Sequence, residues 1–129
     1  MRFVETPRAP RPGGHYSQAV IHNGTIYVAG QLPIDPENPK GPPGDAAQQA
    51  RQALANIRAI LEGAGSGMEH VLQMTIYVSD IEYWGEVNRV YSEVLGDHRP
   101  ARALVPVPNL HYGYLIEIQA IAALPEEGT

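Results

Sequence analysis

The sequence contains no cysteine. This absence excludes disulfide bonds, thiolate metal sites and cysteine nucleophiles, and it favours a reducing compartment. The chain also lacks any apolar run near the ~20 residues that a membrane-spanning helix needs. Residues 1–14 are rich in proline and arginine and lack the apolar core of a signal peptide. We therefore expect a cytoplasmic protein with no membrane partner.

Positive charge is also scarce, because nine Lys and Arg stand against fourteen Asp and Glu, for a net charge of -5. Surfaces that bind nucleic acids neutralise phosphates with clustered Lys and Arg, so a nucleic-acid partner is not expected. The five histidines form no tight motif with one another or with an acid, so no metal site is expected. The sequence contains neither a Gly-x-Ser-x-Gly elbow nor a glycine-rich phosphate loop.

A chain of 129 residues, of which 43% are hydrophobic and 18% charged, is typical of one globular domain with a single core. We expect the domain to span residues 1–129, with an extended arm at 1–14 and a frayed tail at 124–129. Asn23-Gly24 between two β-prone runs predicts a hairpin. The expected strands lie at about 17–22, 25–31, 69–80, 100–107 and 115–123, and the proline-rich segment 32–44 is expected to be a loop with at most a short edge strand at 32–34.

Two helices are expected between these strands. Asp45 with Gln48 resembles a capping box at the start of the first helix, and apolar residues recur at helical spacing until Gly63 and Gly65 end it. Ser79 or Asp80 is expected to cap the second helix, which Gly96 stops.

The resulting order, ββ-α-β-α-ββ, predicts an α+β domain with a mixed, mostly antiparallel sheet. The short links within the two end pairs favour antiparallel pairing of 17–22 with 25–31 and of 100–107 with 115–123. The two helices must cover one face of the sheet. Because apolar residues occur on both faces of several strands, the simplest cover for the other face is another copy of the chain.

The last two strands carry the main candidate functional side chains, Arg102, Glu117 and Gln119, which we expect on one face of the sheet. A guanidinium is costly to desolvate without a partner, so Arg102 either faces water at an edge or binds an anion such as a carboxylate. The alternative is a structural ion pair with Glu117 or with an acid of another subunit. Glu117 could shuttle a proton and Gln119 could orient a water, or both could line a polar seam between subunits.

Two further candidates lie outside these strands. Tyr16 follows Gly13-Gly14-His15 and could present its phenol to a site, although such a tyrosine often only packs with its hydroxyl in water. Asn88 lies beside the apolar stripe of the second expected helix, where an asparagine is usually only solvated.

Six segments together resemble the RidA (YjgF) family of reactive intermediate deaminases, formerly described as L-PSP endoribonucleases. They occur in the order and at about the spacing of that family, from about residue 12 to 123, and the ordered set is far more specific than any one segment. The segments are Gly14-His15-Tyr16-Ser17-Gln18, Val28-Ala29-Gly30-Gln31-Leu32-Pro33, Gln49-Ala50-Arg51-Gln52-Ala53-Leu54-x-Asn56-Ile57, Val87-Asn88-x-x-Tyr91, Pro100-Ala101-Arg102 and Ile116-Glu117-Ile118-Gln119-Ala120-Ile121-Ala122.

The resemblance implies a chorismate-mutase-like α+β fold that forms a homotrimer, with the sheets lining a central barrel, the helices outside and the sites between subunits. It implies hydrolysis of enamines and imines, such as 2-aminoacrylate and its imine, to a 2-keto acid and ammonia. It implies that no cofactor or metal is needed. The expected partner is therefore a small metabolite that bears a carboxylate.

The resemblance also assigns roles to particular residues. Arg102 pairs with the substrate carboxylate, Tyr16 lines the cleft, and Asn88 belongs to the site. The backbone of Ala29-Gly30 and of Ala103-Leu104 borders the ligand. By the same resemblance one position of the last strand, here Gln119, handles water, and Glu117, about 6–7 Å along the strand on the same face, is the alternative group that could handle protons.

The chain departs from the family pattern at three of these positions. The last strand of the deaminases usually reads Ile-Glu-Ile-Glu-Ala, and Gln119 replaces its second glutamate, the position to which the resemblance assigns the handling of water. An amide can orient a water but cannot transfer a proton at useful pH. Leu104 replaces a frequent cysteine, which makes the site larger and drier, and Ala29 replaces a frequent serine.

These departures leave three functions open. The first is a trimeric imine or enamine deaminase. The second is a non-catalytic module of the same fold that binds a small carboxylate such as a 2-keto acid. The third is an endoribonuclease, which the acidic composition disfavours.

Overall fold

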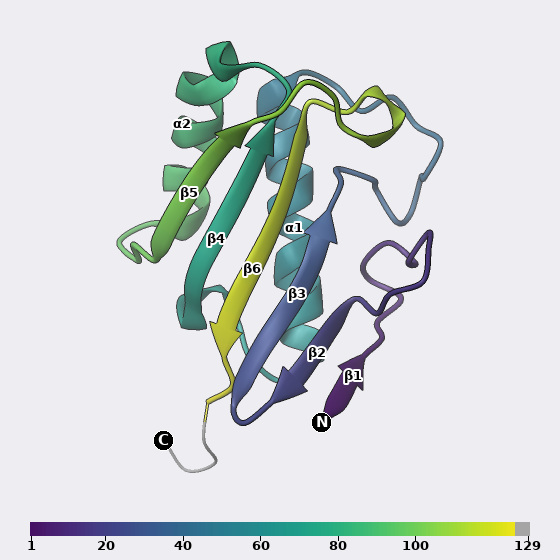
Figure 1. Ribbon diagram of the computed structural model, residues 1–129, viewed down its shortest axis with the longest axis vertical. Helices are drawn as coiled ribbons and strands as arrows, with labels where there is room; N and C mark the ends of the chain where they lie inside the picture. The colour runs from purple at the N-terminus through teal and green to yellow at the C-terminus, as the bar shows by residue number, and fades with distance from the viewer. Residues whose placement is uncertain (126–129) are drawn as a thin grey trace.

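The structure, a computed structural model that describes residues 1–125, is one six-stranded sheet with two helices on one face (Figure 1). The strands are β1 (Arg2–Val4), β2 (Ala19–His22), β3 (Thr25–Gln31), β4 (Val71–Val78), β5 (Ala101–Pro106) and β6 (Ile116–Ala123), and the helices are α1 (Ala46–Gly63) and α2 (Trp84–Leu95). The order across the sheet is β1-β2-β3-β6-β4-β5, and in the described chain every neighbouring pair is antiparallel except β4 and β5. The expectation of a mixed, mostly antiparallel sheet covered by two helices is confirmed.

Local sequence signals predicted the first hairpin and the first helix correctly. Asn23 and Gly24 both have positive φ, 52° and 75°, as a type I′ turn requires, and they join β2 to β3. At the start of α1 the Gln48 N–H donates to Asp45 Oδ1 at 2.9 Å, and the Asp45 N–H donates to Gln48 Oε1 at 2.8 Å. This reciprocal pair is the predicted capping box.

The last strand does not pair with the strand before it, so the predicted antiparallel pair of 100–107 with 115–123 is wrong. β6 instead lies between β3 and β4 and is antiparallel to both, while β5 lies parallel to β4 at the edge of the sheet. The chain crosses from β4 to β5 through α2, and a crossover of that length returns the chain in the same direction. The central position between β3 and β4 is left for β6.

This register places Arg102 and Glu117 on opposite faces of the sheet, whereas we expected them on one face. Arg102 pairs with Met74 of β4, a fully buried residue of the core under the helices. Glu117 pairs with Tyr77, which alternates with the buried residues of β4. Because successive side chains of a strand point to opposite faces, Arg102 faces the helices, while Glu117 and Gln119 face away from them.

The N-terminal arm begins with a strand that the sequence did not reveal. β1 pairs with β2, and a three-residue strand is too short to show a periodic pattern. Gln18, which is 2% exposed, holds the rest of the arm. Its Oε1 accepts the Thr6 N–H at 2.7 Å, and its Nε2 donates to the carbonyls of Thr6 and Pro10, both at 3.0 Å. The arm is therefore clamped to the start of β2.

Three smaller expectations differ in detail. Asp80 caps a short 3₁₀ turn, Ile81–Tyr83, that precedes α2, because its side chain accepts the Glu82 N–H at 2.9 Å. Residues 32–34 form no strand, and Asn56 of α1 instead donates to the carbonyls of Leu32 and Ile34. The tail predicted to fray, 124–129, lies mostly outside the described residues.

The face of the sheet that points away from the helices has no cover within residues 1–125. Tyr27 on this face is 49% exposed, and its partner Ile121 on β6 is only half-buried. Val105 on β5 is half-buried as well. None of the described helices combines the length and the apolar character of a membrane span. An apolar sheet surface is thus available to another chain.

Candidate functional site

Arg102 lies on the edge strand β5, on the helix side of the sheet. Its Nη1 donates to Asn88 Oδ1 of α2 at 2.8 Å. Its guanidinium carbon is 4.9 Å from the centre of the Tyr91 ring, within the range of a cation–π contact. Among the described residues no ion pair involves Arg102, so the alternative of an ion pair with Glu117 of the same chain is wrong. Neutral groups orient the guanidinium and leave its charge and most of its donors available for an anion.

Tyr91 supports Arg102 through its ring. Tyr91 is 7% exposed, and its buried hydroxyl has no hydrogen-bond partner among the described residues. Burial raises the pKa of this hydroxyl, and the charge of Arg102 opposes the shift. Because burial disfavours the phenolate, Tyr91 presents a neutral aromatic face to the guanidinium. The sequence placed Tyr91 in a family segment without a role, and this contact supplies one.

Glu117 lies in a cavity of about 290 Å³ between the N-terminal arm, the end of β3 and the loop before β6. A β-bulge interrupts the pairing of β3 with β6 between Val28 and Gln31. The bulge brings the backbone of Gly30 against the carboxylate, and a Cβ at position 30 would lie 2.8 Å from Glu117 Oε2. Glycine at this position therefore lets the strand pass directly beside the carboxyl group.

The electrostatic setting of Glu117 favours proton transfer. Its carboxyl group is half-buried, and this burial raises its pKa. His111, which lines the same cavity, opposes the shift because a positive imidazole stabilises the carboxylate. A carboxyl group with a raised pKa exchanges protons closer to neutral pH than a solvated glutamate, which suits general acid–base chemistry.

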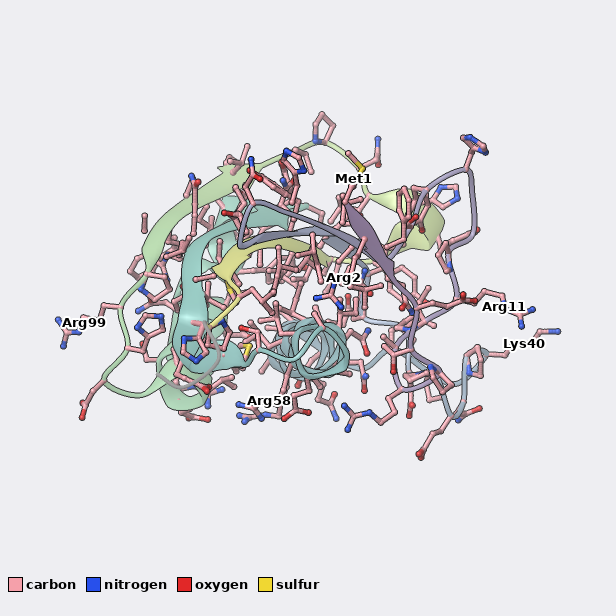
Figure 2. The ribbon with its side chains drawn as sticks, turned by 90° about the horizontal axis from the view of Figure 1, so that it is seen from below. Met1, Arg2, Arg11, Lys40, Arg58 and Arg99 are labelled. Carbon is pink, nitrogen blue, oxygen red and sulfur yellow. The ribbon has the colours of Figure 1, made fainter. Side chains whose placement is uncertain are left out.

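Tyr16 reaches this cavity from the N-terminal arm, as expected. It is 54% exposed, and its hydroxyl accepts the Gly13 N–H at 3.3 Å. Arg11 of the same arm also lines the cavity, and Figure 2 shows its side chain extending outward from the molecule. Gln18, just before β2, donates to the carbonyl of Pro10 and so fixes the arm next to Arg11.

The other predicted residues divide between the two faces. Gln119 is on the same face as Glu117, but its Oε1 accepts the Tyr77 hydroxyl at 2.9 Å, and it is not among the residues that line the Glu117 cavity. Ala29 lies in the bulge beside Gly30, and its N–H donates to the Gln18 carbonyl at 2.9 Å.

The two residues after Arg102 also point to different faces. The exposed Ala103 pairs with Thr75 and faces away from the helices. Leu104 pairs with the buried Ile76 and packs against the core on the helix side. Leu104 therefore shares a face with Arg102, and its apolar bulk is partly used by the core.

The structure thus separates two groups of candidate functional residues. The arginine half-site consists of Arg102, Asn88 and Tyr91, and the carboxylate half-site consists of Tyr16, Gly30, His111 and Glu117. β4 lies between the strands that carry the two charged groups, and these groups face opposite sides of the sheet. One chain cannot bring them to the same small ligand. His111 was missed because a lone histidine in a loop forms no sequence motif.

The comparison with protein families gives one match that spans nearly the whole described chain. The family model described as Endoribonuclease L-PSP matches residues 6–124. A RutC family protein of Pyrococcus abyssi is 44% identical over 119 residues, which cover 92% of this chain and 94% of that protein. The 2-iminobutanoate/2-iminopropanoate deaminase of Rattus norvegicus is 41% identical over 121 residues, which cover 94% of this chain and 88% of that protein.

Solved structures share the fold over almost their full length. RidA from an Antarctic Psychrobacter species matches with a TM-score of 0.91 and 36% identity, over 95% of this chain and 99% of that chain. E. coli TdcF with bound serine matches with a TM-score of 0.91 and 32% identity, over 95% of this chain and 98% of that chain.

Proposed function

Because the chain belongs to the RidA/YjgF family, which includes 2-iminobutanoate/2-iminopropanoate deaminases, we propose that it is a hydrolytic imine and enamine deaminase. It acts in the cytoplasm, without a cofactor, on 2-imino acids and enamines of the 2-aminoacrylate type, and it releases a 2-keto acid and ammonia. The observation that carries this proposal is the half-buried carboxyl group of Glu117 in a cavity of about 290 Å³, beside the backbone of Gly30.

The substrate carboxylate binds to Arg102 in this proposal. The guanidinium offers a planar fork of donors, and two parallel hydrogen bonds to a carboxylate are both strong and directional. Asn88 uses one of the donors at 2.8 Å and Tyr91 supports the plane of the group. Because neither partner is charged, the anion of the substrate does not have to displace a carboxylate of the protein.

Hydrolysis then needs one water and one group that moves protons. The water oxygen bonds to the carbon of the C=N group, and its proton passes through Glu117 to the nitrogen. The hydroxyl group of the carbinolamine then gives its proton through Glu117 to the nitrogen, the C–N bond breaks, the carbonyl of the 2-keto acid forms and the nitrogen leaves as ammonia. Imines already hydrolyse in water, so orientation and one acid–base group supply the modest acceleration that is required.

The position of Glu117 makes it the proton-transfer group in this scheme, in preference to Gln119. Glu117 lines the cavity and has a raised pKa, whereas Gln119 is an amide that accepts a hydrogen bond from Tyr77. Tyr16 borders the cavity and helps to position the substrate. Gln119 orients Tyr77 on the open sheet face.

The two half-sites meet between subunits in this proposal. A homotrimer whose sheets line a central barrel would cover the open sheet face and bring the arginine half-site of one subunit to the carboxylate half-site of the next. Support comes from the uncovered apolar face around Tyr27 and from the position of Arg102 on an edge strand. A cyclic arrangement of this kind yields one site for each interface.

The test is an imine-hydrolysis assay with imines generated in situ from a panel of small and large apolar amino acids, with a trapping nucleophile to measure imine lifetime. We expect the wild type to shorten the lifetime and Arg102→Ala to lose ~10²–10³-fold in kcat/KM, because one preorganised ionic contact is removed. Arg58→Ala is the matched control, since Arg58 lies on the outer side of α1, away from the sheet (Figure 2). Equal turnover by Arg102→Ala and wild type would contradict the assigned role.

The shared site has its own test. Arg102→Ala and Glu117→Gln subunits are co-expressed, and the mixed oligomers are purified with two different tags. If each site combines two neighbouring subunits of a trimer, every trimer that contains both variants has one complete site at its three interfaces, so activity returns to about a third of the wild-type level, although each variant alone is nearly inactive. A site within one subunit would give no recovery in the mixture.

A carboxylate-binding module without catalysis is the second candidate, and the replacement of a glutamate by Gln119 and of a serine by Ala29 favours it. In that case 2-keto acids bind in an Arg102-dependent manner, measured by calorimetry, while no imine of the panel is hydrolysed faster. The net charge of -5 disfavours an endoribonuclease.

A further inference from the structure

The loop between β5 and β6 holds His111 in a defined place. Residues His111–Gly113 form a 3₁₀ turn in which Tyr112 has a positive φ of 60°. The ring centres of His111 and Tyr112 are 3.8 Å apart. After the turn, the Leu115 N–H donates to Oε1 of the buried Gln49 at 2.8 Å. The loop is thereby anchored to α1, and His111 is carried to the edge of the carboxylate half-site.

His111 and Glu117 line the same cavity but differ in exposure. His111 is exposed, whereas Glu117 is half-buried against Gly30. The other ionisable side chains that face this cavity are Arg11 and Tyr16 from the arm and Tyr112 from the loop. Arginine keeps its proton at all useful pH values and tyrosine ionises far above neutrality. Of these neighbours, only histidine belongs to the residue type that exchanges protons readily near neutral pH.

We propose that His111 relays protons between Glu117 and bulk water during imine hydrolysis, an inference that rests on the proposed function. Glu117 takes a proton from the attacking water and gives a proton to the departing nitrogen. When the substrate enters as an enamine, its carbon must first take a proton, which comes from bulk water through His111 and Glu117, and the nitrogen of the resulting iminium then loses a proton by the same route. His111 accepts or supplies these protons at the rim, so the protonation state of Glu117 is reset before the next turnover.

The charge of His111 also tunes Glu117 directly. A positive imidazole lowers the pKa of Glu117 and offsets part of the effect of burial. Removing the imidazole is therefore expected to raise the pKa of Glu117 further. The relay and the tuning act on the same residue, so both appear in the pH dependence of kcat.

The decisive variant is His111→Gln, with His22→Gln as the matched control, because His22 is an exposed histidine at the β2–β3 turn. We expect His111→Gln to lower kcat about tenfold with little change in KM, at the low end of general acid–base effects. Small buffers such as imidazole should restore kcat in proportion to their concentration, after subtraction of the uncatalysed rate. The midpoint of the kcat–pH profile that reports Glu117 should also move to higher pH.

The outcomes separate this inference from the proposed function. A wild type that hydrolyses no imine removes the proposed function itself. A wild type that is active, with a His111→Gln variant of equal kcat and unchanged pH profile, overturns the relay alone. A lower kcat that imidazole does not restore, with the same pH profile, also overturns it, because it would show that His111 only shapes the loop. Circular dichroism and thermal melting establish that the variant is folded.

Discussion

The two half-sites place an ionisable group in opposite electrostatic surroundings. Arg102 is surrounded by neutral partners, the amide of Asn88 and the ring of Tyr91, which orient the guanidinium without neutralising it. Glu117 is placed where burial weakens its charged form. The first arrangement keeps the charge of the guanidinium available to bind an anion. The second raises the pKa of the carboxyl group, so that it accepts and releases a proton closer to neutral pH. A site that must hold an anion and also move a proton needs both, and here they are placed on opposite faces of one sheet.

The comparison also shows which half-site depends on local sequence. The partners of Arg102 come from α2, the helix that immediately precedes β5 in the chain. The carboxylate half-site combines the arm, the β3 bulge, the loop before β6 and β6 itself, segments that are far apart in the sequence. The carboxylate half-site is therefore the more sensitive to changes in tertiary structure.

The largest effect that separates the two half-sites is expected for Glu117→Gln. The amide keeps the shape of the side chain but cannot transfer a proton, so kcat should fall ~10²–10⁴-fold. Binding of a 2-keto acid, which we propose depends on Arg102, should change little. Steady-state kinetics and calorimetry measure the two quantities, and a Glu117→Gln variant with wild-type kcat would remove the acid–base role.

The same variant gives a test of stability against pH. Burial places the pKa of Glu117 above its value in the unfolded chain, so its contribution to stability is fully present below the unfolded pKa and is lost as pH rises through the folded pKa. Glu117→Gln avoids that loss. Its Tm should exceed that of the wild type at pH 7, and the difference should vanish below about pH 4. A Tm difference that grows on acidification would contradict the sign of the pKa shift.

Asn88→Ala is expected to weaken the arginine half-site to a smaller degree. The guanidinium loses a hydrogen bond of 2.8 Å that orients it, but it keeps its charge and the Tyr91 ring. We expect KM to rise about tenfold, the equivalent of one hydrogen bond to a charged group, while kcat changes less. Glu86→Ala, at an exposed position in the first turn of α2, is a suitable control, and a fall in kcat alone would point to a different role.

Tyr91→Phe should separate the ring from its hydroxyl. The hydroxyl is buried and unpartnered, so its removal should raise the free energy of unfolding by about 1 kcal/mol and leave the cation–π contact in place. Denaturant unfolding and imine kinetics measure the two effects. A large loss of activity would show that the hydroxyl, and not the ring, serves Arg102.

The smallest effect is expected for Gln119→Glu, which restores the family sequence of the last strand. Gln119 is tied to Tyr77 at 2.9 Å and does not line the Glu117 cavity. The new carboxylate can still accept the Tyr77 hydroxyl, so activity should stay within about twofold of wild type, as for most surface substitutions. A tenfold or larger gain in activity would show that the residue at position 119 positions the attacking water.

The elements predicted correctly are those with a local physical cause. The Asn23-Gly24 turn needs two residues at positive φ, and the α1 capping box needs only two side chains three residues apart. β1 and the start of α2 were missed because a three-residue strand and a single 3₁₀ turn carry too few residues to show a period. Arg102, Tyr16 and Glu117 were singled out from the residue pattern and from the family segments, and their roles stay predictions, whereas His111 and the Arg102–Tyr91 contact have no local signal.

By itself the sequence determined the number and kind of most elements, the family and the chemical types at the site, because each of these depends on residue spacing and composition. Only the tertiary structure decided that β6 lies between β3 and β4, since strand pairing is a long-range choice that chain order does not prescribe. That choice fixes the register, and the register fixes the face to which each side chain points. It is the reason that Arg102 and Glu117, fifteen positions apart in the chain, face opposite sides of the sheet.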